Sequence, residues 1–249
     1  MRFSVIIPNY NKGKKVRRCL ESIRKQTFKD YEILFIDDMS TDESIDIARE
    51  YCGVIELQSK RLNGGARNEG IIRARGEYCI FIDSDDYFKN ERVFEEIDKA
   101  LNGEDVLFLG YETWFGDSSI PYMPEHKRIE DAIMHCVCAI WTKVIKTEIL
   151  KRNLFPEGTL FEDRTQHYKV LMDCKSFKNL EMNAILWDRS DEGNTSKKKN
   201  FETYEGNFVS EMMRIIPEVK NEELRKYYID EVKRYAEHIK EMVGEYDKA

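Results

Sequence analysis

Three carboxylates occupy four positions of the sequence, at Asp83, Asp85 and Asp86, directly after the apolar run Tyr78–Ile82. A short, continuous apolar run is typical of a strand buried on both faces, and open α/β sheets bind ligands at the carboxyl ends of such strands. Two carboxylates about 4 Å apart repel by roughly 4 kcal/mol at an effective dielectric constant near 20. A divalent cation with oxygen ligands would offset that repulsion. The alternative is a helix cap, but a cap needs only one acid, so the cluster favours a metal–phosphate site.

Polar residues also follow the first two strands that we predict. Pro8-Asn9-Tyr10-Asn11 comes after the first strand and Asp37-Asp38 after the second. In a parallel sheet these loops meet the acidic cluster at one edge. They supply an aromatic ring for stacking, together with amide and carboxylate groups that can bond a base. The arrangement predicts a site for a nucleoside diphosphate.

The sequence contains neither GxGxxG nor GxxxxGK[ST], the glycine-rich motifs that bind phosphate. A diphosphate would therefore need a metal and basic side chains. Arg67 can supply one such charge, because it lies in the first turn of a predicted helix. That helix carries a stripe of small residues, which lets it pack closely on the sheet: Ala66, Gly70 and Ala74. The alternative for Arg67 is an exposed arginine on the surface.

The first 110 residues alternate between β-type and α-type patterns, which predicts a mostly parallel, doubly wound α/β sheet flanked by helices. Pro8 ends the first predicted strand, because proline cannot donate to a sheet ladder. We place Asn63-Gly64-Gly65 in a loop and end the following helix at Gly76, as a C′ residue. The predicted strands are Phe3–Ile7, Tyr31–Ile36, Val54–Leu57, Tyr78–Ile82 and Asp105–Leu109.

The pattern changes after Tyr111. Residues 115–128 form a polar, proline-containing stretch that we predict to be a loop, and residues 188–200 are again polar. The remaining predicted elements are a strand over Ala139–Ile145, a helix over Leu160–Met172, a strand over Phe177–Trp187 and a long helix from Glu222 onward.

Composition excludes several classes of protein. The 249 residues include 40 Lys and Arg against 47 Asp and Glu, a net charge of −7, which argues against a nucleic-acid partner. No window reaches the ~18 apolar residues of a membrane span, and the apolar start of the chain is too short for a signal peptide. The six cysteines contain no CxxC pair and the four histidines no metal-ligand spacing. We therefore expect reduced thiols and a cytoplasmic protein.

Four stretches together resemble family 2 glycosyltransferases of the GT-A fold, and the resemblance spans roughly residues 3–190: SVIIPNYNKGKKVRRCLESIRKQTF, EILFIDDMSTDES, LNGGARNEGIIRARGEYCIFIDSDDYF and FEDRTQHYKVL. It implies an inverting enzyme that uses Mg²⁺ or Mn²⁺ to move a sugar from a UDP-sugar to a hydroxyl of a glycan or lipid-linked acceptor in cell-surface polysaccharide synthesis. It also implies a Rossmann-like domain over 1–200, with a nucleotide-sugar half (1–110) and an acceptor half (111–200). Residues 201–249 would be a helical C-terminal extension.

The resemblance assigns roles to residues of the predicted site. Asp83-Ser84-Asp85 matches the DxD motif, in which Asp83 lies near the ribose and Asp85 binds the metal. Asp163 resembles the general base. The expected nucleotide-binding residues are Pro8, Tyr10, Asn11, Asp38, Arg67, Asp83 and Ser84, of which Asp38 bonds the uracil ring.

The Glu162-Asp163 pair is adjacent in sequence, and adjacent helical residues point in different directions. Only one of these carboxylates can therefore face the acceptor hydroxyl, which suffices for a single direct displacement. Taken without the resemblance, the pair would simply be two acids favoured by the dipole at a helix start. Glu162 joins Trp141 and Lys143, which resemble a WxK motif, as predicted acceptor-side residues. The alternative for Trp141 is an ordinary buried tryptophan.

Two other functions compete with glycosyl transfer. One is a sugar-phosphate nucleotidyltransferase, but such enzymes usually open with a glycine-rich basic loop that PNYNKGKK matches poorly. The other is a non-catalytic module that binds a nucleotide sugar. The presence of all the motif acids argues against it without proving turnover.

The last predicted helix has an apolar stripe that something must cover: Leu224, Tyr228, Val232, Tyr235, Ile239, Met242 and Tyr246. Three partners could do so, namely the catalytic domain, a second copy of the chain in a homodimer, or a membrane surface. The membrane is the weakest of these, because an interfacial helix needs a basic polar face and this one mixes both signs. Arg189 to Ser196 resembles a diphosphate-binding tract weakly, and Lys197–Lys199 is typical of a solvated run.

Overall fold

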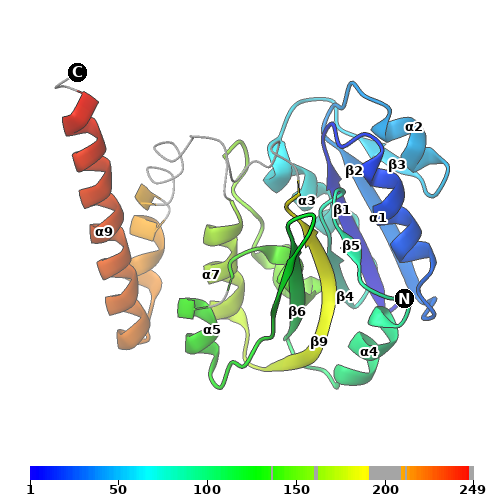
Figure 1. Ribbon diagram of the computed structural model, residues 1–249. Helices are drawn as coiled ribbons and strands as arrows, with labels where there is room; N and C mark the ends of the chain where they lie inside the picture. The colour runs from blue at the N-terminus through cyan, green and yellow to red at the C-terminus, as the bar shows by residue number, and fades with distance from the viewer. Residues whose placement is uncertain (136, 160–161, 191–208, 211, 247–249) are drawn as a thin grey trace.

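The computed structural model describes residues 1–135, 137–159, 162–190, 209–210 and 212–246, with side chains as far as residue 237 (Figure 1). Its strands are β1 Phe3–Asn9, β2 Tyr31–Asp37, β3 Val54–Glu56, β4 Tyr78–Phe81, β5 Tyr87–Phe88, β6 Val106–Trp114, β7 Ser119–Tyr122, β8 Lys143–Lys146 and β9 Phe177–Asp188. Its α-helices are α1 Lys15–Arg24, α2 Ser44–Arg49, α3 Leu62–Arg73, α4 Val93–Ala100, α5 Ile129–His135, α6 Thr147–Arg152, α7 Asp163–Asp173 and α9 Glu222–Tyr246, and its 3₁₀ turns are η1 Ile140–Thr142 and η3 Ile216–Glu218.

The described strands form one sheet in the order β3-β2-β1-β4-β8-β6-β9-β5, and β7 pairs with β6. β1 pairs in parallel with β2 and β4, and β6 pairs in parallel with β9. β8 is antiparallel to both β4 and β6, so those two strands point the same way. The predicted mostly parallel sheet is confirmed, although β8 separates β4 from β6.

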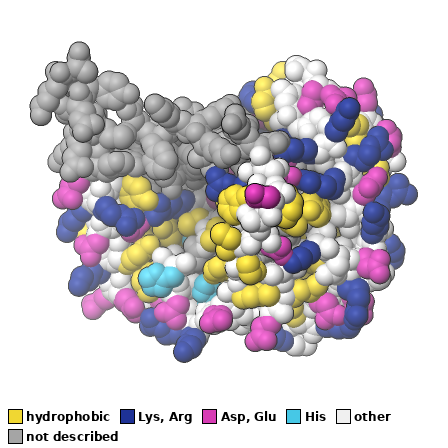
Figure 2. All heavy atoms as spheres, in the orientation of Figure 1, with side chains coloured by type: hydrophobic (Ala, Val, Ile, Leu, Met, Phe, Trp, Pro, Cys, Tyr) yellow, Lys and Arg dark blue, Asp and Glu magenta, His cyan; other side chains and the backbone are white. Residues whose placement is uncertain are grey.

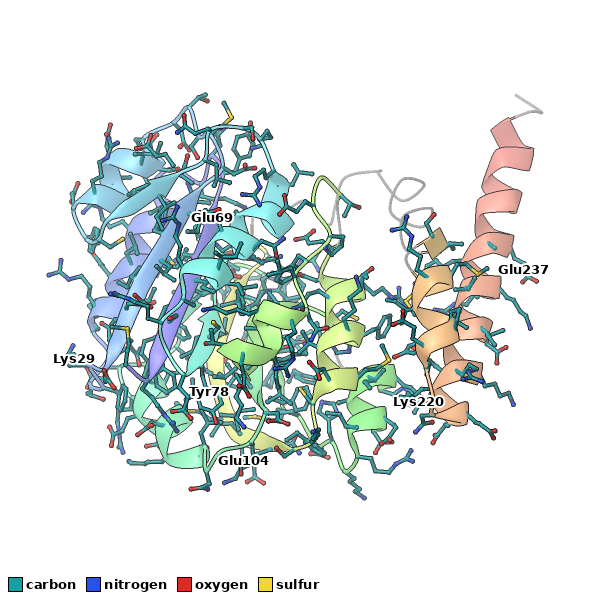
Figure 3. All side chains as sticks on the ribbon, turned by 180° about the vertical axis from the view of Figure 1, so that it is seen from behind. Lys29, Glu69, Tyr78, Glu104, Lys220 and Glu237 are labelled. Carbon is teal, nitrogen blue, oxygen red and sulfur yellow. The ribbon has the colours of Figure 1, made fainter. Side chains whose placement is uncertain are left out.

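Helices cover both faces of the sheet. α1 and α4 lie in front of it in Figure 1, whereas α3 and α6 face the viewer in Figure 3, which is turned by 180°. α1 buries Val16, Leu20 and Ile23, which lie on one face of the helix. Figure 2 shows acidic and basic side chains interspersed over the visible face, with no extended patch of one sign.

The small residues of α3 let the helix lie against β1. A Cβ atom at Gly70 would come within 2.6 Å of Cγ2 of Ile6, a distance that no real packing tolerates. The predicted close approach is therefore confirmed. Gly76 is needed for a similar reason, since a Cβ there would lie 2.5 Å from the backbone nitrogen of Ser4. The prediction that Gly76 closes the helix as C′ is wrong, because α3 ends at Arg73 and Ala74 is already extended.

The first predicted strand was ended too early at Pro8. β1 continues to Asn9, and Pro8 lies opposite Ile36 of β2. The carbonyl of Asn9 accepts from Asp38 on the β2 side, so alternation along the strand turns the nitrogen of Pro8 toward β4. The ladder with β4 ends at Ile6, and the missing N–H of proline loses no hydrogen bond there.

Other predicted boundaries also move. Asn63-Gly64-Gly65 belongs to α3 rather than to a loop, because the carboxylate of Asp38 accepts the backbone N–H groups at the helix start. The predicted loop over 115–128 contains β7, which pairs with β6 as a hairpin. The predicted strand over Ala139–Ile145 begins as η1 and becomes β8 only at Lys143. The predicted domain limits stay a prediction.

We expect replacement of Gly70 by valine to destabilise the fold by about 1–3 kcal/mol, because the new side chain must displace Ile6 from a packed core. Chemical denaturation measures the change. Ile72→Val is the matched control, since it places the same side chain on α3 at an exposed position. Equal stability of the Gly70→Val and Ile72→Val proteins would show that α3 does not need this close approach.

Candidate active site

The ends of β1, β2 and β4 are joined by one buried amide, that of Asn9. Its Nδ2 donates to Oδ1 of Asp37 at 2.8 Å, and its Oδ1 accepts from the hydroxyl of Ser84 at 2.7 Å. The predicted convergence of these three loops on one edge is therefore present. Ser84 is buried, so its hydroxyl holds the loop of the acidic cluster to β1.

Asp38 fixes the start of α3. Its Oδ1 accepts the backbone N–H of Arg61 at 2.8 Å and its Oδ2 accepts that of Leu62 at 2.9 Å. The ammonium of Lys60 lies 3.2 Å from the same carboxylate. Oδ2 is thus shared by Leu62 and Lys60, whereas Oδ1 accepts from Arg61 and has a second lone pair. Asp38 therefore lies at the predicted edge with its carboxylate already engaged by the segment 60–62.

The loop after β1 presents an open aromatic ring. Tyr10 is 45% exposed, and Lys60 lies over its ring. Asn11 adopts a left-handed backbone conformation with φ of 49°. Its side-chain Oδ1 accepts the N–H of Thr41 at 2.8 Å, and its own N–H donates to Ser40 at 3.0 Å. These bonds tie the loop to the end of β2 and leave Tyr10 free to stack.

Arg67 is the centre of the site. Only 1% of the residue is exposed, so the alternative of a surface arginine is wrong. Its Nη1 donates to Glu162 at 2.5 Å and to Asp163 at 2.7 Å, and its Nη2 donates to Asp83 at 2.9 Å. One guanidinium thus joins the first acid of the DxD motif to the predicted base, although Glu162 is 95 positions away in the sequence.

Glu162, Asp163 and Asp83 share the buried cation of Arg67. Burial and the neighbouring charges shift the pKa values of Glu162 and Asp163. Burial raises the pKa of Glu162 to about 7, helped by the neighbouring charge of Asp163 and opposed by Arg67. Burial also raises the pKa of Asp163. The Arg67 guanidinium is disfavoured by burial, but the carboxylates of Asp163, Asp83 and Glu162 outweigh this and raise its pKa.

Exposure separates the two adjacent acids. The side chain of Asp163 is 25% exposed and that of Glu162 only 6%. Both nevertheless reach Arg67, because Glu162 precedes the helix as its N-cap residue and has a longer side chain. Asp163 is therefore the carboxylate that a substrate can approach.

Asp85, the predicted metal ligand, faces a lysine. The Nζ of Lys12 lies 2.5 Å from its Oδ2. Burial lowers the pKa of Lys12, but Asp85, Asp83 and Asp86 outweigh that effect and raise it. A positive charge is therefore already favoured beside Asp85.

Asp86, the third acid, holds the loop to β9. It is buried, and its Oδ1 accepts the backbone N–H of Asp188 at 2.9 Å. Burial raises its pKa well above the ordinary value, and the charges of Asp85 and Asp83 add to this. Asp188 in turn accepts from Arg18 at 2.5 Å. Burial opposes its ionisation, yet bonds from Ser190 and Arg18 lower its pKa to about 2.

The predicted acceptor-side residues Trp141 and Lys143 are both buried. Trp141 packs against Tyr111 and Trp187, with ring centroids 5.1 and 5.5 Å away. The ammonium of Lys143 donates to the carbonyls of Val137 and Ala139 and to the hydroxyl of Thr142. Its charge partly opposes the rise in the pKa of Asp163 that burial causes, so Lys143 acts on Asp163 from within the core.

Comparison with known proteins decides the family. A family model described as Glycosyl transferase family 2 matches residues 4–167, about two thirds of the chain. The chain belongs to glycosyl transferase family 2. The match contains both halves of the site, from the β1 loop to the Glu162-Asp163 pair.

Two relatives carry the name of the same polymer, poly(ribitol-phosphate). The poly(ribitol-phosphate) beta-N-acetylglucosaminyltransferase TarS of Staphylococcus aureus is 30% identical over 257 residues, which cover 93% of this chain and 43% of TarS. A poly(ribitol-phosphate) beta-glucosyltransferase of Bacillus spizizenii is 31% identical over 166 residues, which cover 61% of this chain and 26% of that protein. The chain spans less than half the length of these relatives.

Solved structures confirm the predicted GT-A fold. The crystal structure of S. aureus TarS 1-349 in complex with UDP-GlcNAc gives a TM-score of 0.78 at 24% identity, over 95% of this chain and 72% of that one. The mannosyltransferase PcManGT from Pyrobaculum calidifontis, in complex with GDP-Man and Mn²⁺, gives a TM-score of 0.66 at 16% identity, over 93% of this chain and 69% of that one.

The sequence did not predict three residues whose ion pairs connect the loops at the carboxyl edge of the sheet: Lys12, Arg18 and Asp188. The cluster of basic residues after β1 was a usable signal for the first two, since a cation there must face acids from another loop. Asp188 had no local signal. In the weakly matched tract Arg189–Ser196, Arg189 lies over the ring of Trp187 at 4.7 Å, and residues 191–196 and 197–199 lie outside the described part of the chain.

We predict that the free energy of unfolding of Glu162→Gln, measured relative to that of wild type, increases as the pH rises. The folded-state pKa of about 7 lies above the ordinary value of 4.5, so the folded protein binds more protons than the unfolded chain between these values. The free energy of unfolding therefore falls as the pH rises through that window. Glutamine cannot ionise, and the difference should grow by about 1–3 kcal/mol between pH 4.5 and 8.

Denaturation at pH 4.5, 6 and 8 measures the difference. Glu157→Gln is the control, because bonds from Arg61 hold the pKa of Glu157 below its ordinary value and its contribution is constant over that range. A constant difference for Glu162→Gln as well would mean that Glu162 titrates like an ordinary glutamate.

Proposed function

We propose that this chain is a metal-dependent, inverting glycosyltransferase that moves a sugar from a UDP-sugar to a hydroxyl group of a cell-surface polymer. One observation carries the proposal: Arg67 holds Asp83 of the DxD motif and the solvent-reachable Asp163 on a single buried guanidinium. Donor-side and acceptor-side acids are thereby brought together at the carboxyl edge of the sheet, where α/β proteins bind nucleotides.

Asp85, with Asp83 beside it, would hold Mg²⁺ or Mn²⁺. Within the described part of the chain, no three His, Cys, Asp or Glu side chains converge to hold a metal. Magnesium sites commonly use one or two carboxylates and complete the shell with water and substrate phosphates, so this donor set fits. The Lys12 ammonium at 2.5 Å shows that a cation is favoured beside Asp85. A bound metal would neutralise charge on the leaving diphosphate.

Asp163 would accept the proton of the acceptor hydroxyl. Its side chain is the more exposed of the adjacent pair, and its raised pKa makes it a better base than an ordinary aspartate. Glu162 is buried against Arg67 and orients the site. A single base at the acceptor favours one direct displacement, which inverts the configuration at the anomeric carbon.

The nucleoside would bind along the ends of β1 and β2. Tyr10 is exposed and can stack on a base, while Pro8 and Asn11 shape the loop that carries it. Asp38 has a lone pair left on Oδ1 for a uracil N–H. The S. aureus TarS structure with UDP-GlcNAc supports a uridine donor. Arg67 would act on the nucleotide through Asp83, to which it is bonded.

The acceptor would be a surface polymer rich in hydroxyl groups, a glycan, a lipid-linked sugar or a polyol phosphate. Two relatives named for poly(ribitol-phosphate) support this class. Among the described residues, none of the helices could cross a membrane. Cys19, Cys52, Cys79 and Cys174 are thiols rather than disulfides, which suits the reducing cytoplasm that we propose as the compartment.

A panel of nucleotide sugars tests the function as a whole. UDP-GlcNAc, UDP-glucose and GDP-mannose are each incubated with Mn²⁺ and either poly(ribitol phosphate) or a lipid-linked saccharide, and the product anomer is assigned by NMR. Incorporation of sugar from a UDP donor with inverted configuration supports the proposal. A product of retained configuration would contradict it.

We expect Asp163→Asn to lower kcat by roughly 10²-fold or more, because asparagine cannot accept the proton, while the Kd for UDP changes little. Steady-state kinetics and calorimetry measure the two quantities. Asp173→Asn, at the other end of α7, is the matched control. Wild-type turnover in Asp163→Asn would reduce the Glu162-Asp163 pair to a structural role at the helix start.

We expect Asp85→Ala to abolish the dependence of UDP affinity on Mn²⁺ without unfolding the protein. Lys12→Met should act in the opposite direction and tighten Mn²⁺ binding measured without nucleotide, because it removes the cation that competes for Asp85. Titration calorimetry measures both, and Lys14→Met, at an exposed neighbouring lysine, is the control. UDP binding that stays equally metal-dependent in Asp85→Ala would exclude Asp85 as the ligand.

A further inference from the structure

The C-terminal helix contacts α7 at the residue next to the proposed base. Arg164 follows Asp163 in the first turn of α7, and its Nη2 donates to Oε2 of Glu231 on α9 at 2.5 Å. Its Nη1 donates to the hydroxyl of Tyr235, whose ring lies 4.7 Å from the guanidinium carbon. Helix α9 therefore binds α7 through Arg164, the residue that follows Asp163.

This contact is buried. Glu231 is 7% exposed, and the side chain of Arg164 is 16% exposed. Burial removes most of the water that would compete for the ion pair, so its geometry is held more tightly than that of a surface pair. The other oxygen of Glu231 pairs with Arg234 one turn further along α9.

α9 is itself seated firmly on the chain's own domain. Tyr228 is fully buried, with its ring centroid 4.9 Å from that of Tyr168 of α7. The hydroxyl of Tyr227 donates to the carbonyl of Met134 in α5 at 3.1 Å, and Leu224 is buried. Figure 1 shows α9 on the side of the domain that carries α5 and α7, with the orange segment that precedes α9 between them in this view. The first half of the apolar stripe is thus covered by the catalytic domain. Homodimerisation stays a prediction, since the side chains beyond residue 237 lie outside the described part.

The first turn of α7 is held from two directions. Successive helical residues point about 100° apart, so Asp163 is directed to Arg67 while Arg164 is directed to α9. Arg67 and a backbone hydrogen bond from Ile140 hold Asp163 on one side of the turn. Glu231 and Tyr235 fix the other, and together the two contacts determine how far Asp163 projects into the site.

We propose that Glu231 and Tyr235 are positioning residues for catalysis, which act through Arg164 to set the place of Asp163. The C-terminal helix is then part of the catalytic machinery rather than an appendage. The inference rests on the proposed role of Asp163 as base. A base displaced by about 1 Å can lose on the order of 10²-fold in rate, whereas the donor site on the far side of Arg67 is unaffected.

The test compares two glutamates on one helix. Glu231→Gln removes the charge that holds Arg164, and Glu223→Gln is the matched control, because Glu223 pairs with Arg128 of the same domain at an exposed position. Turnover is followed as Mn²⁺-dependent hydrolysis of UDP-GlcNAc or UDP-glucose, whichever the donor panel selects. We expect Glu231→Gln to lower kcat at least ten-fold and to shift the acidic limb of its pH profile. The Kd for UDP should stay within two-fold, and Glu223→Gln should match wild type.

Two further variants keep the outcome decisive. Tyr235→Phe removes one hydroxyl and leaves the packing in place, so it reports on the contact with Arg164 even if Glu231→Gln unfolds. Arg164→Glu combined with Glu231→Arg should recover part of the turnover that either single change loses. A kcat equal to that of wild type in Glu231→Gln overturns the inference. If Glu231→Gln does not fold, the same result in Tyr235→Phe overturns it. A loss of kcat that is accompanied by an equal loss of UDP affinity also overturns it. If Asp163→Asn is inactive while these variants behave like Glu223→Gln, only the inference fails. An active Asp163→Asn would instead refute the proposed base.

Discussion

The buried guanidinium of Arg67 is the interaction on which the site depends. It contacts both the acid after β4 and the two acids at the start of α7. A planar guanidinium presents five N–H donors in a rigid fork, so its two terminal nitrogens can each hold carboxylates in a fixed direction. Helix α3 sets the position of this guanidinium, and the small residues of α3 allow the helix to lie against β1. Close helix packing therefore determines where the charge sits.

Two other cations lie at the same edge of the sheet, one in the loop after β1 and one in α1. Lys12 meets Asp85, and Arg18 meets Asp188 at the end of β9. Each pair spans two elements, so the loops of the edge are held by charge as well as by hydrogen bonds. Asp83 and Asp85 each have a different positive partner, Arg67 and Lys12. Asp86 is bonded to the backbone N–H of Asp188 instead, and burial raises its pKa well above the ordinary value, which lessens the repulsion among the three acids.

Local patterns predicted much of the fold and of the site. The apolar runs located β1, β2 and β4 to within two residues, because burial on both faces leaves a clear signal. Weak alternation located β9 to within one residue. The edge position of Asp38, Asp83 and Asp85 followed from the parallel sheet. The pairing of Arg67 with Glu162 could not be predicted, since it joins residues 95 positions apart through tertiary packing alone. β8 was misplaced at its start because η1 has no distinctive periodicity.

The position of β8 in the sheet affects how the sheet forms during synthesis and where the chain can be truncated. Residues 143–146 fill the gap between β4 and β6, although both of those strands are synthesised earlier. Until β8 arrives, β4 presents an unpaired edge and the sheet is split into two pieces. A fragment that stops near residue 110 would keep that exposed edge, which invites pairing with other chains. The predicted half over residues 1–110 therefore lacks the strand that completes its sheet.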